Sequence, residues 1–322
     1  MKPAMRMLLA TAAMTVAGAV GGQTFPSRPV TLTVGFAAGG GADTAARIIA
    51  QKLGENLGQS VIVENKAGAG GNIAAQHIAM AQPDGYTLHL TSVGPMSVAP
   101  HLVKDLAYLP KRDIAPITMG VVFPNVFVVH SGVPAKTLAE FVALAKQKPG
   151  QLTYASSGVG GAGHLAGELF KERAGIDVLH VPYKGGGPAM TDLLGGRLDM
   201  YVGVPSTVAP HIDAGKVRAL ATTGAKRTST MPGVPTVAES GYPGFEATNW
   251  YAFVAPSKTP RDLLDFWNRE LTKVLNDPQV KAELAKLGLD PAPGTRDELA
   301  QYIERETEKW GKVVREAKIT AE

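Results

Sequence analysis

The chain of 322 residues contains no cysteine, few aromatic residues and few charged ones. Aromatic residues make up 6% of the sequence and charged residues 19%. Without cysteine, a disulfide scaffold and a cysteine-based zinc centre are both excluded. The 45% of hydrophobic residues can fill a large core, which excludes a disordered or collagen-like chain. At this length two domains are expected rather than one.

A strong excess of either charge is also missing. The 32 Lys and Arg residues exceed the 28 Asp and Glu residues by four, and they are scattered along the chain rather than gathered into one stripe. A nucleic-acid partner is therefore not expected. Beyond residue 23, no segment has the unbroken apolar length of a membrane helix, so we expect the mature chain to lie outside the membrane.

The first residues have the organisation of a signal peptide. Lys2 and Arg6 precede an apolar run, 7–20, which is too short to span a bilayer and is followed by small residues. The alternative is a buried N-terminal helix. We predict a leader at 1–23 whose removal takes two cations away, and therefore export to the periplasm.

Motifs of catalysis are absent as well. The sequence has no G-x-S-x-G elbow and no S-x-x-K pair, and its seven histidines show neither H-E-x-x-H nor H-x-x-x-H spacing. We therefore expect no metal, no cofactor and no enzymatic activity. Residues that meet only in the folded chain leave one alternative open, an exported hydrolase or isomerase that acts on a small organic acid.

Extended and amphipathic segments alternate along the chain, which is typical of βαβ units and parallel sheets. Strands are expected at 30–36, 61–63, 86–90, 121–123, 126–129, 152–155, 178–181, 199–202, 217–221 and 250–254. Helices are expected at 43–53, 72–81, 137–146, 165–174, 188–194, 207–214, 261–275, 280–287 and 296–315.

Two breaks interrupt this alternation, at 110–134 and at 224–244, and both are rich in proline, glycine or β-branched residues. Two βα series joined at two separate places indicate two lobes connected by two crossing strands, with a cleft between them. We predict a first lobe at 25–123 plus 224–322 and a second lobe at 124–223, each built on a mostly parallel sheet flanked by helices.

Three glycine-rich loops connect a strand to a helix, at 36–43, 65–72 and 156–164. Consecutive glycines let the backbone turn its N–H groups toward one point, and the following helix adds free donors and the positive end of its dipole. Such loops could hold an anion from both lobes. The alternative is that each is simply a tight turn.

The third loop also matches G-x-G-x-x-G through Gly158, Gly160 and Gly163. A dinucleotide site requires an acidic residue after the next strand, and the nearest one, Asp177, precedes that strand. The first loop lacks the Gly-Lys-Ser/Thr ending of a P-loop. The sequence thus favours neither NAD nor a nucleoside triphosphate.

Several segments in the same order resemble one protein family. They are VGFAAGGGAD at 34–43, VENKAGAGGNI at 63–73, QPDGYTL at 82–88, VPYKGG at 181–186 and WYAFVAP at 250–256. Together they resemble the Bug (Bordetella uptake gene) family, the periplasmic substrate-binding proteins of tripartite tricarboxylate transporters. The resemblance implies a type II periplasmic-binding-protein fold, a Venus flytrap that closes on a small organic acid and delivers it to membrane subunits.

The resemblance also implies which loops grip a carboxylate, largely through backbone amides. In the first lobe these are Phe36, Ala37, Ala38, Gly39, Gly40 and Gly41, and in the second lobe Ser156, Ser157, Gly158, Gly161, Tyr183, Lys184 and Gly185. Gly203 follows a strand where family members often carry a polar residue, which suggests a less polar far end of the pocket and suits an aromatic or simple aliphatic acid.

Side chains around these loops are further candidates. Thr91, Ser92, Ser156 and Ser157 are candidate hydroxyl donors, and Phe36 and Tyr183 are candidates for an apolar wall. His164 and Lys184 are candidate ligand contacts, but the sequence favours the alternative, in which His164 meets solvent or backbone and Lys184 lies at the surface. Asp43 is expected to be an acidic residue in the first turn of a helix, where its charge is favourable.

The hypothesis from the sequence is a monomeric solute-binding protein that captures an aliphatic or aromatic mono- or dicarboxylate between two lobes. An exported enzyme in the same cleft remains the alternative. A surface adhesion module is disfavoured, because it gives no reason for three glycine-rich strand-to-helix loops.

Overall fold

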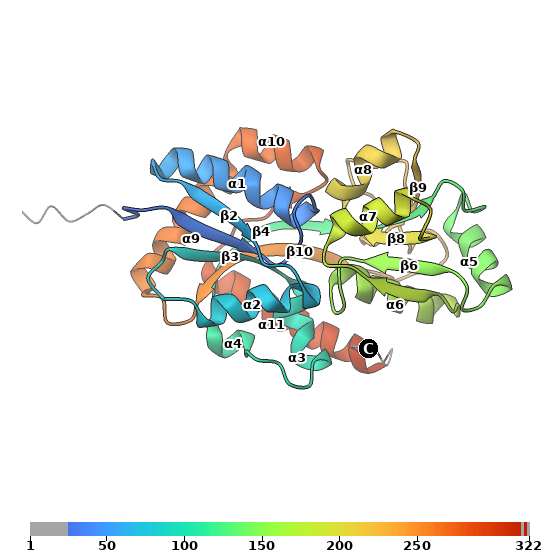
Figure 1. The fold of residues 1–322 in the computed structure, drawn as a ribbon, viewed down its shortest axis with the longest axis horizontal. Helices are drawn as coiled ribbons and strands as arrows, with labels where there is room; N and C mark the ends of the chain where they lie inside the picture. The colour runs from blue at the N-terminus through green and yellow to red at the C-terminus, as the bar shows by residue number, and fades with distance from the viewer. Residues whose placement is uncertain (1–24, 317–318, 321–322) are drawn as a thin grey trace, which may run out of the picture.

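The computed structural model describes residues 25–316 and 319–320, so the predicted leader, 1–23, lies outside the described residues. The chain forms two β-sheets flanked by helices (Figure 1). In order, its elements are β1 (Val30–Val34), α1 (Gly41–Leu57), β2 (Val61–Asn65), η1 (Ala69–Gly71), α2 (Asn72–Met80), β3 (Thr87–Ser92), η2 (Gly94–Val98), α3 (Ala99–Leu102), α4 (Pro110–Asp113), β4 (Ile114–Pro124), β5 (Val126–His130), α5 (Leu138–Gln147), β6 (Thr153–Ser156), α6 (Ala162–Ala174), β7 (Leu179–Pro182), α7 (Gly186–Leu194), β8 (Met200–Gly203), α8 (Pro205–Asp213), β9 (Val217–Thr222), β10 (Thr248–Pro256), α9 (Arg261–Asn276), α10 (Pro278–Lys286), β11 (Asp290–Pro291) and α11 (Arg296–Glu316).

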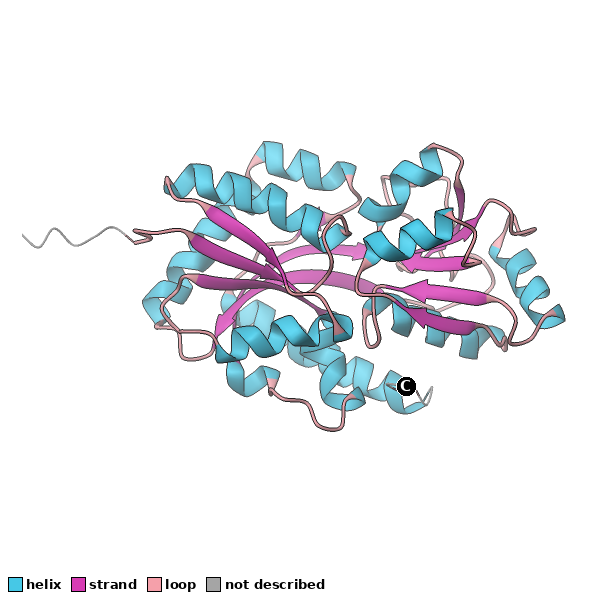
Figure 2. Ribbon diagram, viewed as in Figure 1, coloured by secondary structure: helices cyan, strands magenta, loops and turns pink. Residues whose placement is uncertain are grey.

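Each sheet forms the centre of one lobe (Figure 2). The first lobe is built on a six-stranded sheet of order β11-β4-β10-β3-β1-β2, and the second on a five-stranded sheet of order β7-β6-β8-β5-β9. The predicted two-lobed α/β fold is confirmed. The sheets are mixed rather than mostly parallel: β1 pairs with β2 and β3, and β6 with β7 and β8, in parallel, whereas every pairing of β4, β5 and β10 is antiparallel. The strands that run between the lobes cause this difference.

The chain crosses between the lobes at two places that lie side by side. It passes from β4 to β5 through the single residue Asn125, and it returns to the first sheet in β10. Thr223 links the two crossings: its N–H donates to the Asn125 carbonyl at 2.9 Å, and its hydroxyl donates to the Ala247 carbonyl at 2.7 Å. The two crossings therefore form one hydrogen-bonded hinge.

The segment 224–247 packs against the second lobe, before the chain re-enters the first lobe in β10. The N–H of Val237 donates to the Thr222 carbonyl at the end of β9 at 2.9 Å, and the Phe245 ring packs edge-on against Phe170 of α6. The sequence pattern predicts this segment in the first lobe. On this packing we propose that the second lobe extends to about residue 247.

Helix α1 shows how the sequence positions a glycine-rich loop. Ala45, Ile49 and Leu53 recur every four residues and are fully buried, so one stripe of the helix packs in the core. Gly58 ends the helix in the left-handed conformation with a φ of 63°, where a residue with a Cβ is strained. With this buried stripe anchored, the N-terminus of α1 is held at the cleft.

The segment 93–113 forms short elements that the sequence did not predict. A π-helical turn (η2) and two four-residue helices (α3 and α4) lie here, too short to show a helical repeat of apolar residues. The Tyr108 hydroxyl holds the segment in place, 2.9 Å from the Asn72 side-chain oxygen and 2.8 Å from the Pro95 carbonyl. Burial raises the pKa of this phenol well above its usual value.

Within the described residues, none of the helices combines the length and the apolar character needed to cross a membrane.

Candidate functional site

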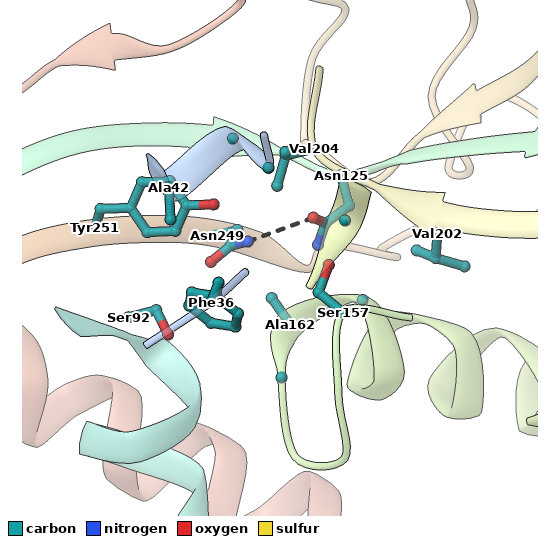
Figure 3. A pocket seen from close by; sticks show the side chains of 15 residues that line it. Phe36, Ala42, Ser92, Asn125, Ser157, Ala162, Val202, Val204, Asn249 and Tyr251 are labelled. Carbon is teal, nitrogen blue, oxygen red and sulfur yellow. Dashed lines mark hydrogen bonds between the residues drawn. The ribbon is translucent and has the colours of Figure 1, made fainter. Parts of the chain in front are cut away.

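A pocket lies where the two lobes face each other, beside the hinge (Figure 3). Both lobes and both crossings contribute to it. Its lining consists of Phe36, Gly40, Gly41, Ala42, Ser92, Asn125, Ser157, Gly161, Ala162, Gly163, Gly186, Val202, Val204, Asn249 and Tyr251. The cavity volume is about 30 Å³ in this closed arrangement.

Four helices begin at this pocket. The N-caps of α1, α6, α7 and α8 are Gly40, Gly161, Gly185 and Val204, and each cap residue or its successor lines the cavity. The first N–H groups of a helix have no partner within the helix, and the helix dipole places roughly half a positive charge at that end. The pocket therefore offers backbone donors from both lobes to one negatively charged group.

The side chains around the pocket are neutral: no lysine, arginine, aspartate, glutamate or histidine is among the described residues that line it. The polar side chains are those of Ser92, Asn125, Ser157, Asn249 and Tyr251. Burial raises the pKa of Tyr251 far above its usual value, so this phenol stays protonated. An anion in the pocket would be held by dipoles and hydrogen bonds, without a charged partner.

The two lobes touch beside the pocket through backbone atoms. The Ala37 N–H, in the loop after β1, donates to the Lys184 carbonyl in the loop after β7 at 2.9 Å. A Cβ at Gly185 would lie 2.8 Å from the Ala37 nitrogen, so a larger residue does not fit there. The loop 184–187 therefore meets the first glycine-rich loop directly, which shows that the lobes are closed.

A second contact between the lobes lies on the other side of the pocket. The loop 158–161 of the second lobe fits between Gly70 and Gly94 of the first. A Cβ at Gly70 would collide with the Val159 carbonyl, and a Cβ at Gly94 would lie 2.9 Å from the Gly160 carbonyl oxygen. We call this contact between Gly70, Gly94 and the loop 158–161 the glycine latch. Its backbones approach so closely because neither glycine has a side chain.

The buried side chain of Asp43 fixes the first glycine-rich loop through hydrogen bonds. Its carboxylate accepts hydrogen bonds from the Gly39 N–H at 3.0 Å, from the Asn65 amide at 2.9 Å and from Arg47 Nε at 3.0 Å. Burial alone would raise the pKa of Asp43, but the bonds from Arg47, Gly39 and Asn65 outweigh it and lower the pKa. The predicted first-turn acid thus also fixes the loop.

Replacing Asp43 with asparagine tests this role. The asparagine would turn one acceptor oxygen into a donor among groups that are all donors, so we expect the free energy of unfolding to fall by about 1–3 kcal/mol. Looser anchoring of Gly39 should also weaken ligand binding. Urea denaturation and titration calorimetry measure the two effects. Arg47→Gln is the control, because it removes only the half-exposed partner of the ion pair and should cost less. Equal losses in the two variants would show that the bonds to Gly39 and Asn65 do not matter.

His164 and Ser156 lie behind the third glycine-rich loop rather than in the pocket lining. The Gly160 N–H donates to His164 Nδ1 at 3.1 Å, and the His164 ring stacks on His180 with the centroids 4.2 Å apart. The Ser156 hydroxyl is 2.8 Å from His180 Nε2. Burial lowers the pKa of His164 to about 4 and that of His180 to about 3. These residues support the loop as neutral groups.

The serine–histidine pair also bears on the enzyme alternative. Ser156 and His180 are close enough for a nucleophile and its base, but Ser156 is fully buried and neither residue lines the pocket. The pocket serine, Ser157, is 3.1 Å from the Tyr201 hydroxyl, whose pKa is raised by burial to about 12. Among the described residues, neither of these two serines therefore combines an exposed hydroxyl with a general base.

The structure brings part of the predicted site together. The predicted residues that line the pocket are Phe36, Gly40, Gly41, Ser92, Ser157 and Gly161. Those that do not line it are Ala37, Ala38, Gly39, Thr91, Ser156, Gly158, His164, Tyr183, Lys184, Gly185 and Gly203. Ala37, Lys184 and Gly185 instead form the interlobe contact. The Tyr183 hydroxyl donates to Asp192 at 2.6 Å, and burial raises the pKa of Tyr183 to about 12.

Sequence reasoning missed the contribution of the hinge. Asn125, Asn249 and Tyr251 line the pocket from the two crossings, and Val204 and Gly186 from the starts of α8 and α7. A weak signal was present, because Asn125 follows Pro124 at the predicted break and Asn249 precedes the predicted strand at 250–254. The sequence predicted two crossing strands, but it did not indicate which residues of the two would pair, and Asn125 and Asn249 are 124 positions apart.

Among the described residues, no group of three or more histidine, aspartate or glutamate side chains is arranged to hold a metal ion.

Two lobes, a hydrogen-bonded hinge and a pocket enclosed between them define the class of periplasmic binding proteins, which hold a solute in such a cleft. The model of the tripartite tricarboxylate transporter family receptor, TctC, matches residues 45–319. The chain belongs to this family.

Known relatives agree with this membership. Protein BugT of Bordetella pertussis is 37% identical over 302 residues, covering 94% of this chain and 93% of BugT. The structure of R. palustris Rpa4515 with adipate is 34% identical, has a TM-score of 0.89 and covers 92% of this chain and 99% of that one. The structure of MatC (Rpa3494) from Rhodopseudomonas palustris with bound malate is 33% identical, has a TM-score of 0.86 and covers 90% of this chain and 100% of that one.

Proposed function

We propose that this chain is an exported, periplasmic solute-binding protein that captures a small organic carboxylate between its lobes and delivers it to the membrane subunits of a tripartite tricarboxylate transporter. The observation that carries the proposal is the meeting of four helix N-termini in a pocket lined by neutral side chains. Membership of the receptor family supports the transporter partner, and relatives with adipate and malate support the class of ligand.

The energetics explain why both lobes must take part. Two or three charge-assisted hydrogen bonds to one carboxylate contribute about 1.5–3 kcal/mol each. Much of this is offset by the loss of rigid-body freedom on binding. A micromolar affinity, about −8 kcal/mol, then requires donors from the second lobe as well as from α1. Closure of the cleft is part of binding.

The same geometry explains why we propose capture without chemistry. None of the described residues that line the pocket titrates near pH 7, so none of these side chains is suited to move a proton to or from a bound acid. The bound compound should leave the cleft unchanged, and the protein should work as a monomer.

The proposal is tested by a thermal-shift screen with mono-, di- and tricarboxylates and the matching carboxamides. A true ligand stabilises the folded chain by RT ln(1 + [L]/Kd), about 2.7 kcal/mol at a hundred times Kd. We expect carboxylates to raise the melting temperature and their neutral carboxamides to have no effect. Mass spectrometry of the recovered compound should show no change. If only cationic or phosphorylated compounds stabilise the protein, the carboxylate assignment is wrong, and a converted compound would favour the enzyme.

A further inference from the structure

Asn125 is a buried polar residue at the centre of the hinge. It is the single residue between β4 and β5, its exposed fraction is 1%, and its side chain lines the pocket. Asn249 lies opposite on the returning strand β10 and is also buried. The Asn249 amide nitrogen donates to the Asn125 side-chain oxygen at 3.3 Å, as the dashed line in Figure 3 shows.

The contacts of Asn249 fix the orientation of both amides. The Asn249 side-chain oxygen accepts the N–H of Trp250 at 2.8 Å, so its nitrogen faces Asn125 and requires an acceptor there. Of the two side-chain atoms of Asn125, the oxygen can accept this bond and the nitrogen cannot. The Trp250 N–H thus orients Asn249, and Asn249 in turn orients Asn125 so that its nitrogen, Nδ2, points away from Asn249.

Every other polar group of Asn125 is already bonded. Its N–H donates to the Thr223 hydroxyl at 2.8 Å, and its carbonyl accepts the Thr223 N–H at 2.9 Å. Its Nδ2 is buried and has no hydrogen-bond partner among the described residues. A buried donor without a partner is costly, so it points to an acceptor supplied by a ligand.

We propose that Asn125 determines specificity: its Nδ2 donates to a second oxygen acceptor of the ligand, apart from the carboxylate that the helix N-termini hold. The inference rests on the proposed function. The Nδ2 donor selects dicarboxylates and hydroxy or keto acids over simple monocarboxylates, because a simple monocarboxylate leaves this donor without a partner. It also disfavours an ammonium group at this position, because a donor would then face a donor.

The position of Asn125 links this recognition to closure. The residue belongs to neither sheet and lies on one crossing, bonded to the other crossing through Thr223 and Asn249. A ligand bound to Nδ2 therefore contacts the hinge while the helices of both lobes hold its first carboxylate. A ligand that lacks the second acceptor makes only the lobe contacts.

The experiment compares two ligand pairs by titration calorimetry on the wild-type protein: succinate with butanoate, and adipate with hexanoate. Within each pair, a terminal carboxylate is replaced by a methyl group at the same chain length. We expect at least one dicarboxylate to bind about tenfold or more tightly than its partner. In Asn125→Asp, which still offers an oxygen to Asn249 but turns the donor into an acceptor, we expect this preference to fall below about threefold.

Controls separate the possible outcomes. Asn125→Ala removes the donor without burying a charge, so it tests the same loss if Asn125→Asp fails to fold. Asn276→Asp makes the same chemical change at an exposed residue of α9 and should keep the wild-type preference. A preference that persists in the Asn125 variants, or its absence in the wild type, overturns the role of Asn125 alone. If no carboxylate binds the wild-type protein at all, the proposed function fails, and the role of Asn125 fails with it.

Discussion

Replacing Gly94 with alanine should weaken carboxylate binding about 10- to 100-fold, because closing the lobes would carry an overpacking cost of about 1–3 kcal/mol. Across the glycine latch, the added Cβ would lie 2.9 Å from the Gly160 carbonyl oxygen and 3.4 Å from the Gly161 Cα. Within its own lobe it would lie 3.3 Å from the Gly70 carbonyl oxygen, a milder contact. All three neighbours are backbone atoms, which cannot move aside as a flexible side chain would. Gly94 does not line the ligand pocket, so the ligand contacts themselves would be unchanged.

Two measurements test this prediction, one of ligand affinity and one of the shape of the protein in solution. Titration calorimetry gives the dissociation constant, and small-angle X-ray scattering tells whether saturating ligand still compacts the variant. The unliganded variant should melt only slightly below the wild-type temperature, because open lobes keep the milder contact with Gly70 but lose the contacts with Gly160 and Gly161. Gly233→Ala is the matched control, since a Cβ there meets nothing within 4 Å. If Gly94→Ala binds as tightly as the control, the latch is not part of the ligand-bound state.

The free energy of unfolding should fall steeply in acid because of buried histidines, and His89 allows the cleanest test. His89 lies in β3 with an exposed fraction of 1%, and its Nδ1 is 3.0 Å from the Thr33 carbonyl oxygen. Its Nε2 is buried without a partner among the described residues. A proton added to Nε2 would create a buried cation with no acceptor, and this burial lowers the pKa of His89 to about 4.

The direction of the effect follows from the two pKa values. The unfolded chain has an ordinary histidine pKa of about 6.5, so between pH 6.5 and 4 the unfolded state binds more protons than the folded state. Stability is therefore present at pH 7 and is lost as the pH falls through this window. The depressed pKa of His89 corresponds to a loss of about 3 kcal/mol by pH 4. His164 and His180 act in the same direction.

Urea denaturation at pH 7 and at pH 4 measures this loss. His89→Asn keeps an amide N–H for the Thr33 carbonyl but cannot take up the proton. We expect the variant to be less stable at pH 7 and to lose about 3 kcal/mol less than the wild type on going to pH 4. An unchanged difference between the two pH values would contradict the assignment to His89.

The sequence predicted those parts of the fold that local patterns encode. Strands and helices alternate as expected, and glycines mark the strand-to-helix loops at the cleft. Pro116 and Pro124 concealed part of the crossing strand β4, because proline cannot donate to a strand ladder and argues against a central strand. The mixed sheets could not be predicted, since strand direction depends on pairings such as Phe253 with Leu90, far apart in the chain.

The pocket was predicted only where the chain approaches it through a glycine-rich loop. Gly40, Gly41 and Gly161 were recognised because a glycine before a helix is a local feature. Asn125 and Asn249 were not recognised, because they reach the pocket only when two distant segments fold into one hinge. The positions of the residues behind the loops could not be predicted for a related reason. His164 lies in the first turn of α6, a position from which a side chain can face either the ligand or the core, and packing against His180 decides between them.

We propose that main-chain amides bind the anion. Affinity for a carboxylate and the shape of the pocket can then change independently, whereas most binding sites couple these two properties. Every residue except proline carries an N–H, so changes of side chain at Ala42 or Ala162 can reshape the cavity while the donors of α1 and α6 remain. Substitutions in such a chain can change its ligand specificity while carboxylate binding is retained. The glycines at the lobe contacts lack this freedom, because a side chain at Gly70, Gly94 or Gly185 would meet backbone atoms of the other lobe and obstruct closure.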